Sequence, residues 1–173
     1  MADLGKGGPR RFHLSNSQDL RVHCDLAKGI LYKPAGCFWY DIDGDWIRWV
    51  LSEQPDWLRL YLYEVTVCEE RVLRICSMEE LLRFQATFHV PILPGLSRYS
   101  DTIDWSAVAE RWGGVEIAPY QWRHRCESVW YYGWDCASGV IWDAQAVTSV
   151  RLVAEGEKEI TAFAASLGVE MPA

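Results

Sequence analysis

Alternation of hydrophobic and polar residues predicts several β-strands along the chain. The clearest case is WLRLYLYEVTV, residues 57–67, in which every second residue falls on the same face of an extended backbone. One face carries Leu58, Leu60, Leu62 and Glu64, and the other carries Arg59, Tyr61, Tyr63 and Val65. Shorter stretches predict strands at residues 10–14, 36–40, 71–75, 115–118 and 149–155. The stretch WYYGWDCASGVIWD, residues 130–143, predicts two further strands around a turn.

Hydrophobic residues at helical spacing, next to capping residues, predict helices between these strands. The strongest is SMEELLRFQATF, residues 77–88, in which Ser77 and Glu80 match a capping box. Its predicted apolar face consists of Leu81, Leu82, Phe84 and Phe88. DWSAVAERW, residues 104–112, predicts a second helix that is capped by Asp104 and ended by two glycines.

Three other segments give weaker helical patterns. In DIDGDWIRWVLSE, residues 41–53, a turn at residues 43–44 precedes a helix with Asp45 as its N-cap. Residues 15–29 are predicted as a turn and a short helix, with Ser15 or Ser17 as the N-cap. Residues 157–168 are predicted as a helix or a tail.

The order of these segments predicts one α+β domain, because no repeat, linker or low-complexity block divides the chain. A chain of 173 residues is long enough to bury one hydrophobic core. We predict a flexible start at residues 1–10, a folded domain at residues 11–155, and a C-terminal helix or tail at residues 156–173.

Composition and charge narrow the class of protein. Half of the residues are hydrophobic and 24% are charged, which is typical of a globular protein. The apolar runs are too short to span a membrane, and the first residues lack the apolar segment of a signal peptide, so we expect a cytoplasmic protein. The six cysteines contain no CxxC pair, which favours reduced, buried thiols over a zinc site. The net charge is 17 − 24 = −7, so a polyanion site would have to be local, for example at residues 123–125.

The chain contains ten tryptophans, an unusual number for its length. They gather at positions 39, 46 and 49 and again at positions 130, 134 and 142. A small core does not need so many large rings, and aromatic-lined clefts bind flat ligands. For each single ring, a place in the core remains the alternative.

The aspartates of AGCFWYDIDGDWIRWV, residues 35–50, alternate as they do in a calcium-binding loop. An EF-hand loop that began at Asp41 would need glycine where Trp46 stands and a carboxylate where Ser52 stands. A turn at residues 43–44 and a helix cap at Asp45 explain the carboxylates without a metal. We therefore predict no metal site.

The order of motifs resembles the ADP-ribosyltransferase fold, in particular its poly(ADP-ribose) polymerase-like and DNA-targeting toxin branches. A strand that carries His13 is followed by the glycine-led aromatic strand GCFWY, an acidic turn and a helix that bears Trp49. The segment YLYEVTVCEERVLRICSMEELLRF resembles the middle strands and helix of such toxins, and GGVEIAPY is similar to the strand that carries their catalytic glutamate. The segments IDW, GGVEIAPY and WYYGWDCASG also resemble uncharacterised bacterial and phage proteins.

This resemblance implies a specific fold and a specific site. The fold would consist of two packed, mixed or antiparallel sheets around a cleft for NAD, with short helices. Glu116 would stabilise the oxocarbenium-like transition state of ADP-ribose transfer and would orient the acceptor. The residues implied to bind NAD are His13, Leu14, Ser15, Tyr40 and Trp49, with Tyr40 and Trp49 stacking on nicotinamide. The chain differs from many relatives at Asp41, where they have serine or threonine, and at Leu14, where some have glycine.

The leading hypothesis is therefore an NAD-dependent ADP-ribosyltransferase, acting as a toxin or a defence-related effector on a protein, DNA or RNA acceptor. A second hypothesis is a non-catalytic module whose aromatic surface, including QWRHRCESVWYYGWD, binds a nucleotide or a partner protein. Under that hypothesis Glu116 has a structural role. A third and weaker hypothesis keeps the fold but changes the chemistry to NAD hydrolysis or to phosphate transfer from RNA ends.

Overall fold

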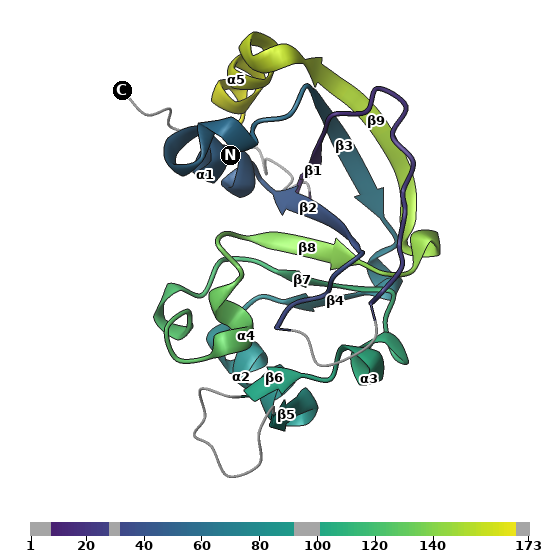
Figure 1. Cartoon of the computed structure of the whole chain (residues 1–173), viewed down its shortest axis with the longest axis vertical. Coiled ribbons are helices and arrows are strands. Elements are labelled where there is room, and N and C mark those ends of the chain that lie inside the picture. Colours follow the sequence, from purple (N-terminus) through teal and green to yellow (C-terminus); the bar gives the residue numbers. More distant parts are fainter. Residues whose placement is uncertain (1–7, 28–31, 92–100, 169–173) are drawn as a thin grey trace, which may run out of the picture.

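One long mixed sheet organises the part of the chain that the structure describes, residues 8–27, 32–91 and 101–168 of a computed structural model (Figure 1). Its seven strands have the order β4-β7-β8-β2-β1-β3-β9, and a second sheet pairs β5 with β6. β4 and β7 run parallel, whereas the other neighbouring strands are antiparallel. The strands are β1 (Arg11–Ser15), β2 (Phe38–Ile42), β3 (Tyr61–Val67), β4 (Val72–Ile75), β5 (His89–Pro91), β6 (Asp101–Ile103), β7 (Gly114–Ile117), β8 (Ser138–Ile141) and β9 (Val147–Glu155).

Helices gather at the two ends of this sheet. They are α1 (Asp45–Glu53), α2 (Met78–Phe88), α3 (Trp105–Ala109), α4 (Val129–Tyr132) and α5 (Gly156–Ser166), with single 3₁₀ turns at Pro55–Trp57, Glu69–Arg71, Trp122–His124 and Ala144–Ala146. In Figure 1, α1 and α5 lie near β1, β3 and β9, and α2, α3 and α4 lie at the opposite end with the β5–β6 hairpin. The predicted α+β class is confirmed.

Seven of the strands join into one continuous sheet, where the family resemblance implied two packed sheets around a cleft. β1 causes this difference, because it pairs with β2 on one side and with β3 on the other. The six single strands predicted at residues 10–14, 36–40, 57–67, 71–75, 115–118 and 149–155 correspond to β1, β2, β3, β4, β7 and β9. Most of their boundaries move by one or two residues, but β3 begins four residues later than predicted.

The capped helices were predicted correctly, with two corrections of detail. Ser77 caps α2 by accepting a hydrogen bond from the Glu80 N–H, and Asp104 caps α3 in the same way. Leu82 was assigned to the apolar face of α2 but is 48% exposed, because α2 buries Leu81, Phe84 and Phe88. The other correction concerns α1, where Gly44 takes the N-cap position predicted for Asp45.

Two other predictions of secondary structure were wrong. Residues 16–27 form bends and extended chain instead of a short helix, and the end of that prediction, residues 28–29, lies outside the described residues. The carbonyls of Ser17 and Gln18 accept hydrogen bonds from the Tyr63 hydroxyl, which fixes a non-helical path. In residues 130–143, the first predicted strand is the short helix α4, and the second is β8.

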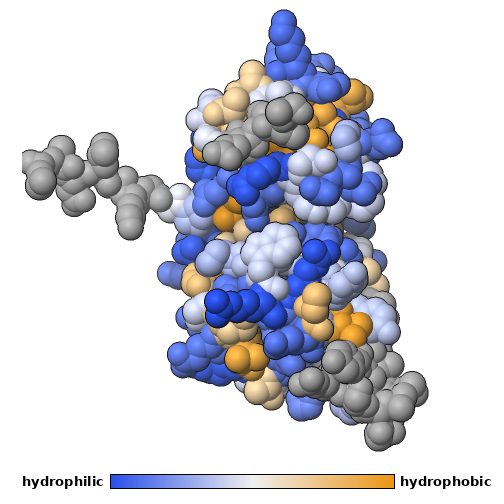
Figure 2. All heavy atoms as spheres, turned by 90° about the vertical axis from the view of Figure 1, so that its left-hand side faces the viewer, coloured by the Kyte–Doolittle hydropathy of each residue, from blue (hydrophilic) through white to orange (hydrophobic). Residues whose placement is uncertain are grey.

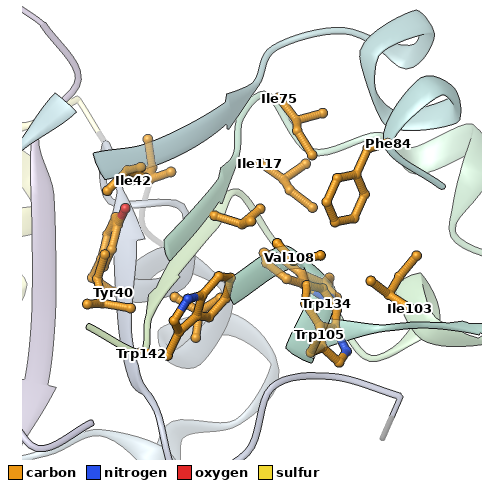
Figure 3. Close-up of a cluster of buried hydrophobic side chains, with 14 of the residues drawn as sticks. Tyr40, Ile42, Ile75, Phe84, Ile103, Trp105, Val108, Ile117, Trp134 and Trp142 are labelled. Carbon is orange, nitrogen blue, oxygen red and sulfur yellow. The ribbon is translucent and has the colours of Figure 1, made fainter. Parts of the chain in front are cut away.

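Two apolar clusters hold the helices against the sheet. In the larger one, Ile75 of β4 and Ile117 of β7 lie near Phe84 of α2 (Figure 3). The same cluster contains Trp130 of α4, which is fully buried and donates its indole N–H to Gln85 at 3.0 Å. The smaller cluster packs α1 and α5 against β1 and β3 through Phe12, Ile47, Leu62, Ala154, Ile160 and Ala164.

The surface and the helix lengths give no sign of a membrane span in the described residues. None of the described helices combines the length and the apolar character needed to cross a bilayer. On the face shown in Figure 2, hydrophobic residues form small, separate areas among hydrophilic ones.

Candidate functional site

The sheet brings Tyr40 and Glu116 together on one face. Tyr40 of β2 pairs with Gly139 of β8, and Gly139 pairs with Glu116 of β7, so the three residues form one row across three strands. Directly opposed residues of neighbouring strands project to the same face. His13 lies on this face too, because the pairing of Phe12 with Asp41 places it next to Tyr40.

Gly139 allows the tyrosine and the glutamate to meet. A Cβ atom on Gly139 would overlap Cζ, Cε2 and the hydroxyl of Tyr40, so the tyrosine ring lies directly over the glycine. From this position the Tyr40 hydroxyl donates a hydrogen bond to Glu116 Oε2 at 3.1 Å. Burial raises the pKa of Tyr40 well above its ordinary value, and the nearby Glu116 carboxylate raises it further.

Two arginines neutralise the Glu116 carboxylate. Arg11 Nε lies 2.6 Å from Oε2, and Arg74 Nε lies 3.1 Å from Oε1. The side chains of Glu116 and Arg11 are 1% and 6% exposed, whereas Arg74 reaches the surface at 40%. Burial lowers the pKa of Arg11, but the hydrogen bond to Glu116 and the charges of Glu116 and Glu69 outweigh it and leave the pKa raised. Glu116 therefore occupies a closed ion-pair network in which both of its oxygens are engaged.

A pocket of about 110 Å³ lies beside β1 and β2 and under α1. Its lining consists of Phe12, His13, Leu14, Trp39, Tyr40, Asp41, Trp46 and Ser138. Strand alternation separates these residues, because Leu14, Trp39 and Asp41 project to the face opposite to that of Tyr40. Three of the five predicted NAD-binding residues, His13, Leu14 and Tyr40, thus border the pocket, but the side chains of His13 and Tyr40 project to the other face of the sheet, as does the Glu116 carboxylate.

The His13 ring lies on the Tyr40 face of the sheet, opposite to the pocket, and is held in its neutral form. Its Nδ1 lies 2.7 Å from the Trp39 carbonyl oxygen, and its ring stacks on Phe38 with centroids 4.4 Å apart. A carbonyl oxygen can only accept, so Nδ1 carries the proton and Nε2 is the acceptor of the neutral imidazole. Burial lowers the pKa of His13 and thereby favours this neutral form.

Ser15 and Trp49, the other two predicted NAD-binding residues, lie outside this pocket. The Ser15 hydroxyl oxygen accepts a hydrogen bond from the Ser17 N–H, as in a local turn. Trp49 lines a separate hollow of about 180 Å³ with Arg48, Trp122 and other residues of α1 and of the 120–136 segment. Its ring also contacts Trp46 and Trp57, each with centroids 5.6 Å apart.

The tryptophans that line the pocket are Trp39 and Trp46, two residues that the sequence analysis did not place at the NAD site. Alternation along GCFWY separates Trp39 from Tyr40 but does not show which of them faces a ligand. The sequence pattern also did not show whether Trp46 faces the core or a ligand. This residue follows the first residue of α1 and lies between the buried face and the exposed face of the helix. Ser138 of β8 gave no sequence signal, since only the pairing of Asp41 with Ser138 brings it to the pocket.

Asp41 is the carboxylate of this pocket, and it also caps α1. Its two oxygens accept hydrogen bonds from the N–H groups of Gly44 and Ile47, at 2.8 and 2.9 Å. Asp45, the residue predicted to cap the helix, instead accepts a hydrogen bond from the Ala137 N–H and pairs with Arg48. Burial raises the pKa of Asp41 to about 7, although the two backbone hydrogen bonds act in the opposite direction.

The raised pKa of Asp41 predicts that the protein loses stability as the pH rises from about 4 to about 7. In this range the folded state keeps a proton on Asp41 that the unfolded state releases, so a higher pH favours unfolding. The shift from 3.8 to about 7 corresponds to a loss on the order of 4 kcal/mol. Urea unfolding at several pH values checks this, and Asp41→Asn is expected to remove most of the decline. A decline of the same size in Asp41→Asn would assign it to other groups.

No protein-family model, curated protein or solved structure matches this chain.

Proposed function

We propose that the pocket beside β1 and β2 binds the nicotinamide ring of NAD, and that the chain is an ADP-ribosyltransferase that passes ADP-ribose to a macromolecular acceptor, a protein or a nucleic acid. One observation carries this proposal: the side chains of Leu14, Trp39 and Trp46 line a single pocket, which the strands also border at His13 and Tyr40, two further residues expected at an NAD site. Flat rings bind between aromatic side chains, because such contacts exclude water over a large area.

The size and polarity of the pocket suit the nicotinamide end of NAD. A volume of about 110 Å³ has room for one substituted six-membered ring, so the ribose and the diphosphate would lie outside it. The backbone at Leu14 and the Ser138 hydroxyl are the polar groups available to the carboxamide. The Ser138 hydroxyl donates to the Cys136 carbonyl at 3.2 Å, so its oxygen would be the atom that accepts from the carboxamide N–H₂.

The transfer reaction needs a carboxylate near the ribose, because positive charge develops there as the bond to nicotinamide breaks. Glu116 would serve only after leaving Arg11 and Arg74, since both ion pairs hold it on the other face of the sheet. Asp41 lines the pocket, but its carboxylate is 3% exposed and caps α1.

The ion pairs of Glu116 favour a second candidate, a non-catalytic nucleotide-binding module on the same fold. In that case the same pocket binds the ring of the nucleotide, and the only role of Glu116 is to stabilise the fold. The two candidates differ in one measurable property, since only the transferase releases nicotinamide from NAD.

Trp46→Ala is expected to weaken NAD binding about tenfold, because stacking on one aromatic side chain contributes about 1–3 kcal/mol per base. Isothermal titration calorimetry with NAD measures this effect. Trp57→Ala is the matched control, because Trp57 contacts Trp46 at a centroid distance of 6.4 Å and is 47% exposed but does not line the pocket. Equal losses in the two variants would contradict binding at this pocket.

Nicotinamide release from labelled NAD, with and without cell extract, separates the two candidates. Release together with label transfer to an acceptor supports the transferase, and binding without release supports the module. If the wild-type protein neither binds nor consumes NAD, the result contradicts both the transferase and the module as proteins that bind NAD.

A further inference from the structure

A second groove, distinct from the aromatic pocket, lies along the exposed edge of β4. β4 is the first strand of the seven-stranded sheet, and among the described strands it pairs with β7 alone. The groove has a volume of about 290 Å³, and three consecutive residues of β4 line it, Leu73, Arg74 and Ile75. The groove thus follows β4 over three consecutive residues, and the side of β4 away from β7 has no strand partner among the described residues.

The opposite wall of the groove is a stripe along α2. Arg83, Phe84, Thr87 and Phe88 have the i, i+4 spacing of one helical face, and all of them line the groove. Trp112, which follows α3, also lines the groove. The groove therefore combines a free strand edge with aromatic side chains, a combination that binds an extended peptide as an added strand.

Charge selects the kind of peptide that would fit. Arg74, Arg83 and Arg111 line the groove, against one acidic lining residue, Glu80, in a chain whose net charge is −7. The Glu80 carboxylate already accepts a hydrogen bond from the Cys76 N–H at 2.6 Å. Arg74 projects with Glu116 to the other face of the sheet, so Arg83 and Arg111 are the arginines that complement carboxylates on an incoming strand.

The three arginines differ in how strongly they are already engaged. Arg111 lies over the Phe88 ring at 5.1 Å, and it forms no ion pair with any described residue. Arg83 pairs with Glu79 at 2.7 Å, but both side chains are more than two-thirds exposed, and such a surface pair is weak. Arg74 is bound to Glu116. Arg111 and Arg83 are thus the groups most available to a partner.

We propose that the groove along β4 binds an extended, acidic segment of a partner protein, which adds to the sheet as a strand next to β4. Its backbone pairs with the outward N–H and C=O of Arg74, since the Val72 N–H already donates to the Glu69 carbonyl and the Cys76 N–H donates to Glu80. Its apolar side chains lie on the half-buried Leu73 and Trp112, beside the nearly buried rings of Phe84 and Phe88, and its carboxylates meet Arg83 and Arg111. This proposal does not depend on NAD binding.

A fluorescent seven-residue peptide that alternates valine with glutamate, blocked at both ends, tests the proposal by fluorescence anisotropy. Arg111→Glu and Arg83→Glu are each expected to weaken its binding about tenfold or more, because each change removes a charged hydrogen bond and adds repulsion. Arg21→Glu is the matched control, because it changes the net charge equally at a side chain that is 87% exposed and does not line the groove.

Two altered peptides separate strand addition from nonspecific attraction. Glutamine in place of glutamate is expected to abolish binding, and so is N-methylation of two consecutive central residues, because one of these residues must turn its N–H toward β4. The proposal is overturned if the acidic peptide does not bind at millimolar concentration. It is also overturned if Arg21→Glu weakens binding as much as Arg111→Glu, or if the N-methylated peptide binds as tightly as its parent.

Discussion

Glu116→Gln is expected to destabilise the protein by about 3–5 kcal/mol, because it leaves two arginines facing a neutral side chain. Arg11 has the larger share of this effect. Its guanidinium is almost fully buried, and Nε lies 2.6 Å from the carboxylate. Arg74 is 40% exposed, so water solvates it after the change. A glutamine can still accept the hydrogen bond from Tyr40, which limits the change mainly to the charge.

Urea unfolding at neutral pH measures this loss. Glu69→Gln is the matched control: Glu69 also pairs with Arg11, at 2.9 Å, but it is 53% exposed, and its loss is expected to cost less than about 1 kcal/mol. Combining Glu116→Leu with Arg11→Met is expected to be less destabilising than Glu116→Leu alone, because no buried charge then remains unpaired. A Glu116→Gln protein as stable as the Glu69→Gln control would contradict a closed ion-pair network.

This result also decides how the enzymatic test is interpreted. Loss of nicotinamide release in Glu116→Gln supports a catalytic carboxylate only if the variant is still folded and still binds NAD at the temperature of the assay. If Glu116→Gln loses both its stability and its nicotinamide release, the structural role of Glu116 explains the result equally well. Unfolding and NAD binding therefore have to be measured on the same preparation.

The sequence predicted those elements whose signals are local. The N-caps at Ser77 and Asp104 depend on residues three positions away, and both were confirmed. β1, β2, β4, β7 and β9 were found from short apolar or alternating runs. The strand around Leu62 was also found, but its alternation did not show that Leu62 and Tyr63 are both buried. Leu62 belongs to the cluster under α1 and α5, and Tyr63, on the other face, contacts residues 17–18, so both faces of β3 are covered here.

Elsewhere tertiary contacts override local preference. Residues 129–132, Val-Trp-Tyr-Tyr, favour a strand by intrinsic propensity, but they form α4. The helix places Trp130 against Phe84 and Trp105, and it lets the Tyr131 hydroxyl accept a hydrogen bond from the Gln121 N–H. These partners are distant in sequence, so the pattern of residues 130–143 does not contain them.

The candidate site shows the same limit. Alternation in GVEI and GCFWY gave the strands of Glu116 and Tyr40, and the structure confirms both strands. The surroundings of Glu116 depend on Arg11 and Arg74, which are 105 and 42 residues away in the sequence. A short-range pattern cannot show that a strand glutamate is neutralised by two arginines, nor that Trp39 and Trp46 line a pocket on the opposite face.

Gly139→Ala is expected to destabilise the protein by about 3 kcal/mol, the upper part of the usual range for overpacking a core. The reason is a close approach and not an unusual backbone angle, since the added Cβ would overlap the ring of Tyr40. Tyr40 is 3% exposed and its hydroxyl is bound to Glu116, so the ring cannot move away without breaking that hydrogen bond.

Thermal or urea unfolding of Gly139→Ala, Tyr40→Leu and the double variant tests this close approach. A shorter side chain at position 40 removes the overlap, so Gly139→Ala is expected to cost less in the Tyr40→Leu background than alone. Gly133→Ala is the control, because the nearest atom to its new Cβ, Lys33 Cδ, lies at an ordinary contact distance of 3.5 Å. Equal costs for Gly139→Ala in both backgrounds would show that the Tyr40 ring does not lie over the glycine, and the contact between Tyr40 and Glu116 would then have to be revised.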